Sequence, residues 1–177
     1  MQCKYCKKQS DNEICSVCGS KLYSNALAYA SLKHAGQIRK NGDPYIFHPL
    51  KVARYLYDQG YDIRYQVVAL LHDVIEDTDA TYDDLKNFCD DEMLEAVRLV
   101  TKTDGYIEQD YIDAILKHNM AKAVKNSDRI NNLEDSLYSG DPEFQKRYIK
   151  ETIEYYEGNF SSELDDTLAK LVEKIGV

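Results

Sequence analysis

The sequence predicts an all-α protein that carries a small zinc ribbon at its N-terminus. Beyond residue 22 the apolar residues recur at helical spacing, as Leu27, Ala30 and Ile38 do, and no run alternates convincingly enough for a strand. Four of the five cysteines are gathered before residue 22 as two CxxC pairs. We therefore expect two units, a zinc ribbon over 1–22 and one helical bundle over 23–177.

The ribbon is predicted from Cys3, Cys6, Cys15 and Cys18, whose spacing suits two knuckle turns that face each other across a short hairpin with a little strand. Two such pairs are typical of a tetrahedral Zn²⁺ site. A redox pair would need a βαβ context that the sequence lacks, and disulfides do not suit the cytoplasmic location expected below. The ribbon could pin the N-terminus of the bundle, mediate self-association or recruit a protein partner.

The first elements of the bundle are predicted from their caps and turns. Ser24 can cap a helix over 25–39, and the Asn-Gly-Asp-Pro stretch at 41–44 indicates a turn. Pro49 is suited to the first position of a helix that ends near residue 60.

The later elements are all helices as well. A helix over 63–77 comes first, and Thr81 begins another, with Asp84 three residues on in capping-box spacing. The remaining helices are expected over 91–102, 108–118, 119–135, 142–158 and from 161 or 162 to 175.

Composition excludes several classes of protein. The chain has 177 residues, 44% of them hydrophobic, and a formal net charge of −9. That charge disfavours broad electrostatic binding to nucleic acid or to an anionic membrane. No stretch approaches the roughly 18 apolar residues that a membrane span needs. The N-terminus lacks the apolar core of a secretory signal, so we expect a cytoplasmic location.

The most informative stretch is 67–77, where four titratable groups interrupt an apolar run. His72 and Glu76 are four residues apart, as are Asp73 and Asp77, and Asp73 and Glu76 are three apart, so a helix would turn all four toward one patch. An isolated His-Asp pair more often ends a surface helix, but the apolar residues 67–71 argue against that here. Because buried charges are normally paired or bound to metal, the pattern predicts a metal ion at His72 and Asp73.

Two distant residues complete a ligand set for that ion. His48 precedes a proline, which places it at a helix entry, and Asp128 continues the apolar stripe of Ala121 and Val124. Together with His72 and Asp73 they supply two imidazoles and two carboxylates, which balance a divalent charge. Mixed nitrogen and oxygen ligation fits Mn²⁺, Fe²⁺, Co²⁺ or Zn²⁺ better than Ca²⁺, and the histidines suffice for one metal.

These residues lie in segments that resemble a known family. Residues 34–49, 69–78, 100–102 and 127–133 resemble, in order and spacing, the HD-domain phosphohydrolases, and in particular the hydrolase domain of the RelA/SpoT family and the small alarmone hydrolases. The likeness covers about 25–135. It implies an HD-domain helical bundle that hydrolyses guanosine tetra- and pentaphosphate with Mn²⁺ and releases the 3′-pyrophosphate.

The resemblance also implies roles for individual residues. His48, His72, Asp73 and Asp128 would hold the metal, while Glu76 and Asp77 would orient and deprotonate the attacking water. Arg39 and Lys40 would lie against the nucleotide, and Asn132 would contact its sugar or phosphate. His34 also matches a family position, where a histidine would either act directly at the site or support it from the core. Where the family often has a basic residue two positions after Asn132, this chain has Glu134, followed by Asp135.

Two alternatives remain open on sequence grounds. One is an HD phosphatase for another nucleotide, such as a nucleoside monophosphate or NADPH. The other is a nucleotide sensor without catalysis, in which the ribbon serves for docking. The presence of both Glu76 and Asp77 favours an enzyme over a sensor.

Overall fold

The computed structural model describes residues 1–175 and confirms the all-α prediction. The helices in this part of the chain are α1 Ser16–Lys33, α2 Phe47–Asp58, α3 Ile63–Leu71, α4 Val74–Asp77, α5 Tyr82–Leu85, α6 Asp91–Val100, α7 Glu108–Leu116, α8 Asn119–Ser136, α9 Pro142–Tyr155 and α10 Ser162–Ile175. None of these helices combines the length and the apolar character that crossing a bilayer requires.

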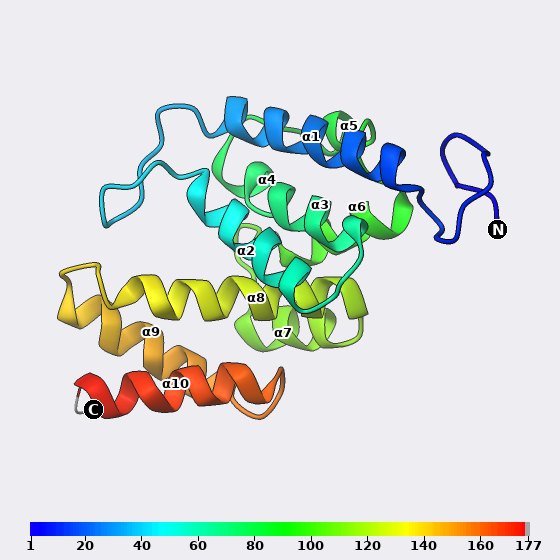
Figure 1. Ribbon diagram of the computed structural model, residues 1–177. Coiled ribbons are helices and arrows are strands. Elements are labelled where there is room, and N and C mark those ends of the chain that lie inside the picture. The colour runs from blue at the N-terminus through cyan, green and yellow to red at the C-terminus, as the bar shows by residue number, and fades with distance from the viewer. Residues whose placement is uncertain (176–177) are drawn as a thin grey trace.

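The helices are arranged around α3 and α8 (Figure 1). Helix α3 packs on α1 and α2, and α8 packs on α2, α6, α7 and α10. Figure 1 shows α1 along one side of the bundle and α9 with α10 along the opposite side. The N-terminal segment lies beyond the first turn of α1, at the opposite end of that helix from the loop that leads into α2.

Helix α3 is the most completely enclosed element. Its residues 67–71 have no exposed surface, because this part of the helix is apolar on every side and neighbours cover it all round.

Helix α8 differs, because it buries polar side chains beside apolar ones. Asp128, Arg129 and Asn131 are all less than a tenth exposed. Burying such groups is unfavourable unless partners satisfy them, so α8 indicates where the polar chemistry of the fold lies.

Helix α1 differs from the helix predicted over 25–39. It begins at Ser16, inside the segment expected to be ribbon, and Ser24 lies within it rather than at its cap. Cys15 is the N-cap and Cys18 lies in the first turn, so the second CxxC pair folds as a helix entry and not as a free knuckle. Within residues 1–15 the pairing of strands is limited to an isolated bridge between Gln2 and Gln9. The early start of α1 is not predictable from the sequence because cysteine is a poor N-cap signal.

The C-terminal end of α1 also comes earlier than predicted. The helix stops at Lys33, and Gly36 follows with a φ of 82°, a conformation that favours glycine. Residues 34–46 then form a loop, which is closed by a bridge between Ile38 and Pro44. The predicted turn at 41–44 lies at the tip of this loop.

The single helix predicted over 63–77 is two helices. Helix α3 ends at Leu71 and α4 begins at Val74, with His72 and Asp73 as the turn between them. Asp73 is the N-cap of α4, with a φ of −97° and a ψ of −10°, some way from the dihedrals of an ideal helix. A helical pattern could not predict this break, because nothing between 67 and 77 is a glycine or a proline.

The other predicted elements agree with the structure to within a few residues. Thr81 and Asp84 form the expected capping box, and Asp141 caps α9 ahead of Pro142. Pro49 lies in the first turn of α2, two residues after the helix begins at Phe47.

Candidate active site

Four side chains from distant parts of the sequence meet inside the bundle. His48 lies in the first turn of α2, His72 and Asp73 lie between α3 and α4, and Asp128 lies on α8. His48 Nε2 is 3.0 Å from Asp128 Oδ1 and 3.6 Å from Asp73 Oδ2. His72 Nε2 is 3.1 Å from Asp73 Oδ1 and 3.7 Å from Asp128 Oδ1. The structure therefore brings all four predicted metal ligands together.

The tautomer of His72 is fixed by the backbone. Its Nδ1 lies 2.7 Å from the carbonyl oxygen of Ala69 and can only donate to it, so the neutral ring presents the lone pair of Nε2 to the cluster. That Nε2 is buried without a hydrogen-bond partner. Burial disfavours the charged imidazolium, but Asp73 and Asp128 outweigh it and raise the pKa of His72 well above its ordinary value. The surroundings of His72 thus favour a positive charge, whether it comes from a proton or from a metal ion.

Asp128 is the most strongly held of the carboxylates. Lys125 Nζ donates to its Oδ2 at 2.8 Å, and Asn132 Nδ2 donates to its Oδ1 at 2.5 Å. Burial opposes ionisation of this carboxyl, yet Lys125 and the two histidines hold its pKa well below the usual range. Asp128 therefore offers an ionised oxygen that could hold a cation inside the protein.

The cluster fits a divalent cation. His48, His72 and Asp128 each offer a ligand atom within 4.8 Å of the others, and all three side chains are buried. Two imidazoles and two carboxylates are the mixed donor set that transition metals accept. The unpartnered Nε2 of His72 is explained if an ion completes its coordination, since buried polar atoms rarely lack a partner.

Glu76 and Asp77, on α4, lie next to this cluster. Glu76 Oε2 accepts a hydrogen bond of 2.8 Å from the backbone N–H of Lys102. Desolvation by the surrounding protein raises the pKa of Glu76, and nearby Asp73 adds to the shift. Asp77 Oδ2 accepts from the hydroxyl of Tyr45 at 2.6 Å. Both carboxylates are thus fixed one helical turn beyond His72 and Asp73, where they could act on a metal-bound water.

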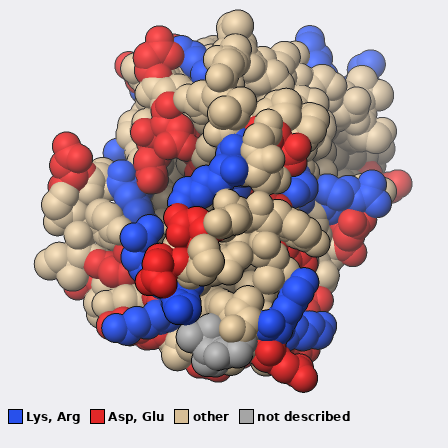
Figure 2. Space-filling model, turned by 90° about the vertical axis from the view of Figure 1, so that its left-hand side faces the viewer, with Lys and Arg blue, Asp and Glu red and all other residues tan. Residues whose placement is uncertain are grey.

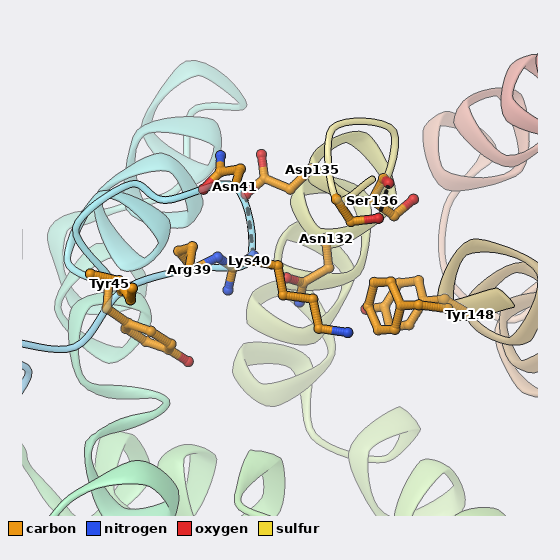
Figure 3. A pocket seen from close by; sticks show the side chains of 11 residues that line it. Arg39, Lys40, Asn41, Tyr45, Asn132, Asp135, Ser136 and Tyr148 are labelled. Carbon is orange, nitrogen blue, oxygen red and sulfur yellow. Dashed lines mark hydrogen bonds and ion pairs between the residues drawn. The ribbon is translucent and has the colours of Figure 1, made fainter. Parts of the chain in front are cut away.

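A cavity of about 280 Å³ opens beside the cluster. Its walls come from the loop 38–45, from the C-terminal half of α8 and from α9, as Figure 3 shows. Arg39 Nη2 donates to Asn132 Oδ1 at 2.7 Å and approaches Asp135 Oδ2 at 3.2 Å. Lys40 Nζ lies 3.3 Å from the centre of the Phe144 ring. The predicted substrate residues Arg39, Lys40 and Asn132 all line this one cavity.

Asn132 is already engaged at both ends of its amide. Its oxygen accepts from Arg39 and its nitrogen donates to Asp128, so it links the wall of the pocket to the candidate metal centre. Asp135, at the position after Glu134, binds both Arg39 and Lys51. Asp135, the neighbour of the residue that departs from the family pattern, therefore holds a pocket arginine in place.

The surrounding face of the molecule carries charges of both signs. The loop 34–46 and the turn between α8 and α9 lie at the left of Figure 1, and Figure 2 views the protein from that side. Lys and Arg side chains run across the middle of this face, with Asp and Glu on either side of them. An anionic ligand would find cations at the pocket, although the chain as a whole carries a charge of −9.

Three residues at the site were not singled out from the sequence. The hydroxyl of Tyr45 lies within hydrogen-bond distance of both Asp73 and Asp77, Lys125 donates to Asp128, and Lys102 supplies its N–H to Glu76. Lys125 precedes Asp128 by three residues, and that helical spacing was a usable signal. No such signal existed for Tyr45, which reaches across from another part of the chain. His34 is buried and stacks on Tyr45, with ring centres 4.6 Å apart.

The four N-terminal cysteines form a second cluster. Each of Cys3, Cys6, Cys15 and Cys18 offers a sulfur within 4.8 Å of the others. The backbone N–H of Cys15 donates to Cys3 Sγ at 3.3 Å, and this contact contributes most to lowering the pKa of the Cys3 thiol to about 6. A thiolate is the form that binds metal, so the cluster is suited to hold an ion.

Comparisons with known proteins agree with this geometry. A family model described as HD domain matches residues 26–158. A probable GTP pyrophosphokinase of Mycobacterium leprae is 37% identical over 142 residues, which cover 75% of this chain and 18% of that protein. A guanosine-3′,5′-bis(diphosphate) 3′-pyrophosphohydrolase of Aquifex aeolicus is 38% identical over 140 residues, covering 74% of this chain and 20% of that protein. The chain thus spans about a fifth of the length of these relatives.

Among solved structures, the fold resembles a metazoan orthologue of SpoT that is described as hydrolysing ppGpp and acting in starvation responses. The TM-score is 0.72 at 27% identity, and the match covers 88% of this chain and 96% of the metazoan chain. A protein of Listeria monocytogenes also matches, with a TM-score of 0.56 at 27% identity over 72% of this chain and 97% of that one.

Proposed function

We propose that this chain, which belongs to the HD domain family, hydrolyses guanosine tetra- and pentaphosphate and releases the 3′-pyrophosphate. The observation that carries the proposal is the meeting of His48, His72, Asp73 and Asp128 beside a cavity lined by Arg39 and Lys40. The names of the Aquifex aeolicus relative and of the metazoan structural match support the same substrate.

The metal of this site is Mn²⁺ in our proposal, held by the two histidines and the two aspartates. When bound, such an ion lowers the pKa of a coordinated water and neutralises charge on phosphoryl oxygens. Glu76 would take the proton of the attacking water, and Asp77 would orient that water. The raised pKa of Glu76 suits a general base, because proton transfer is most efficient when the pKa of the base is near the working pH.

Arg39 and Lys40 would bind the nucleotide in the cavity. A guanidinium can stack on a base and pair with phosphate oxygens, and the contacts from Asn132 and Asp135 hold the Arg39 group in one orientation. Asn132 would act from the same wall, where it also joins Arg39 to the ligand Asp128. This link would let nucleotide binding at the pocket and metal binding at Asp128 reinforce each other.

A nucleotide panel tests the proposal. Purified protein loaded with Mn²⁺ is incubated separately with guanosine tetraphosphate, a nucleoside monophosphate and NADPH, and the products are identified. Pyrophosphate from guanosine tetraphosphate is the expected result, and Asp73→Asn is the inactive control. Orthophosphate from either of the other nucleotides would favour the alternative phosphatase. Tight binding of guanosine tetraphosphate with no turnover would favour the sensor.

The cysteine cluster holds Zn²⁺ in our proposal and pins the start of α1. Residues 1–22 then remain one metal-binding unit and 23–177 the hydrolase unit, although α1 runs across the boundary. Ion pairs support the pinning role, since Lys4 Nζ is 2.8 Å from Asp90 Oδ2 and Arg64 Nη1 is 3.9 Å from Glu13 Oε2. Self-association or a protein partner at the ribbon would add to this role and not replace it.

A further inference from the structure

We propose that Tyr45 is a positioning residue that couples metal binding at Asp73 to the orientation of Asp77. The inference rests on the proposed function, because it takes Asp73 as a metal ligand and Asp77 as a residue that acts on the attacking water. It adds a residue to which neither the sequence pattern nor the comparisons give a role.

Tyr45 is held firmly at the junction of three parts of the site. Its backbone N–H donates to the carbonyl of Gln37 at 3.0 Å, inside the loop between α1 and α2. Its ring stacks on buried His34 at an interplanar angle of 21° and meets the edge of His48 at 78°. On the pocket side, Arg39 lies 5.6 Å from the ring centre, and Figure 3 shows the two side chains next to each other.

The hydroxyl of Tyr45 faces two carboxylates at once. It is 2.8 Å from Asp73 Oδ2, the length of an ordinary hydrogen bond, and 2.6 Å from Asp77 Oδ2, the length of a hydrogen bond to an ionised acceptor. A phenol carries one proton, while an ionised carboxylate can only accept. The hydroxyl therefore satisfies one carboxylate at a time, and the other lacks a hydrogen at that contact.

Metal binding decides which of the two carboxylates accepts the hydrogen bond from the Tyr45 hydroxyl. A cation held by Asp73 draws electron density from that carboxylate and makes it a weaker acceptor. The hydroxyl then donates preferentially to Asp77, whose backbone carbonyl is already held by Gln37 Nε2 at 2.8 Å. Asp77 is thus fixed at both its main chain and its side chain, and the side-chain contact is strongest when the ion is present. Without the ion, the Tyr45 hydroxyl instead donates to Asp73 and holds that carboxylate in the position in which it can bind an incoming ion.

The test is Tyr45→Phe, which keeps the ring, its stacking on His34 and its contact with Arg39. Mn²⁺ affinity is measured without nucleotide, from the electron paramagnetic resonance signal of the free ion. We expect affinity to fall about tenfold, because Asp73 loses the group that holds it. At saturating Mn²⁺ we expect kcat to remain about 10- to 100-fold below wild type, with KM nearly unchanged, because Asp77 stays unfixed.

Either of two results would overturn the coupling. Unchanged Mn²⁺ affinity would mean that Tyr45 does not position Asp73, and full recovery of kcat at saturating Mn²⁺ would mean that it does not position Asp77. Tyr138→Phe is the matched control, because this tyrosine is 70% exposed and lies outside the cavity. Failure of the wild type to hydrolyse guanosine tetraphosphate would reject the proposed function instead, and the affinity measurement would still decide whether Tyr45 positions Asp73.

Discussion

At the scale of single residues, the meeting of the four candidate ligands could be predicted, but the contacts that hold them could not. His48 and Asp128 were predicted from an X-Pro step and from a carboxylate on an apolar stripe, and they lie 3.0 Å apart. The spacing of residues along a helix indicates which side chains share a face. It does not show that Tyr45 reaches Asp73 and Asp77, because that contact depends on how a loop folds over another element.

Glu76→Gln separates metal binding from proton transfer. The amide keeps the size of the side chain and cannot take a proton, so kcat should fall by about 10²- to 10⁴-fold while Mn²⁺ affinity stays close to wild type. Steady-state kinetics and metal titration check this. Glu95→Gln on α6 is the control, since that side chain is half-exposed and pairs only with Arg98. Turnover that survives the loss of Glu76 would remove its role as the base.

At the scale of elements, helix positions and most helix ends were predictable, but the ends of α1 and the break between α3 and α4 were not. The ends of α1 depend on Cys15 as an N-cap and on Gly36 beyond the last turn, and the break between α3 and α4 depends on His72 turning its ring to the carbonyl of Ala69. Helix propensity does not encode these features, because they depend on individual side-chain and turn contacts at the two candidate metal clusters and at Gly36.

The start of α1 should depend on the cysteine cluster. Cys18→Ser removes a thiolate from the first turn, so the protein should lose one zinc equivalent and part of its thermal stability. For a domain of this size, each 2 kcal/mol lost lowers Tm by about 4–8 °C. Metal analysis and thermal unfolding measure both effects. Cys89→Ser, in a buried cysteine outside the cluster, should keep the zinc content, and an unchanged zinc content in Cys18→Ser would contradict the four-cysteine site.

The contact between the N-terminal unit and α6 should be sensitive to pH. Burial opposes ionisation of Asp90, but Lys4, the N–H of Met93 and Arg64 together hold its pKa below the usual value. A lowered pKa stabilises the fold above the unfolded-state pKa of about 3.9, and the contribution is lost as the pH falls through the native value.

Asp90→Asn keeps the helix cap and removes only the charge. At pH 7 the variant should therefore be less stable than wild type by roughly 1 kcal/mol or less, because Asp90 is partly exposed to solvent. The difference should shrink toward zero as the pH is lowered below about 4. Thermal unfolding of both proteins across that range checks the sign, and a difference that grows on acidification would refute it.

At the scale of the whole molecule, the proposed metal centre joins α2, the turn between α3 and α4, and α8, so an ion should stabilise the entire bundle. Binding that is specific to the folded state adds about 2.7 kcal/mol at a concentration 100 times Kd. We therefore expect Mn²⁺ to raise Tm by about 5–10 °C in wild type. His72→Ala should lose this shift, and an equal shift in both proteins would place the ion elsewhere.

The distance between the ligands along the chain has a consequence for biosynthesis. His48 and Asp128 are 80 positions apart in the sequence. When α3 and α4 have just emerged from the ribosome, the nascent chain offers three of the four donors and still lacks the buried carboxylate of Asp128. Non-local contacts of this kind form late in folding. Metalation is thereby postponed until α8 has emerged and docked, and a truncated translation product cannot acquire the assembled centre.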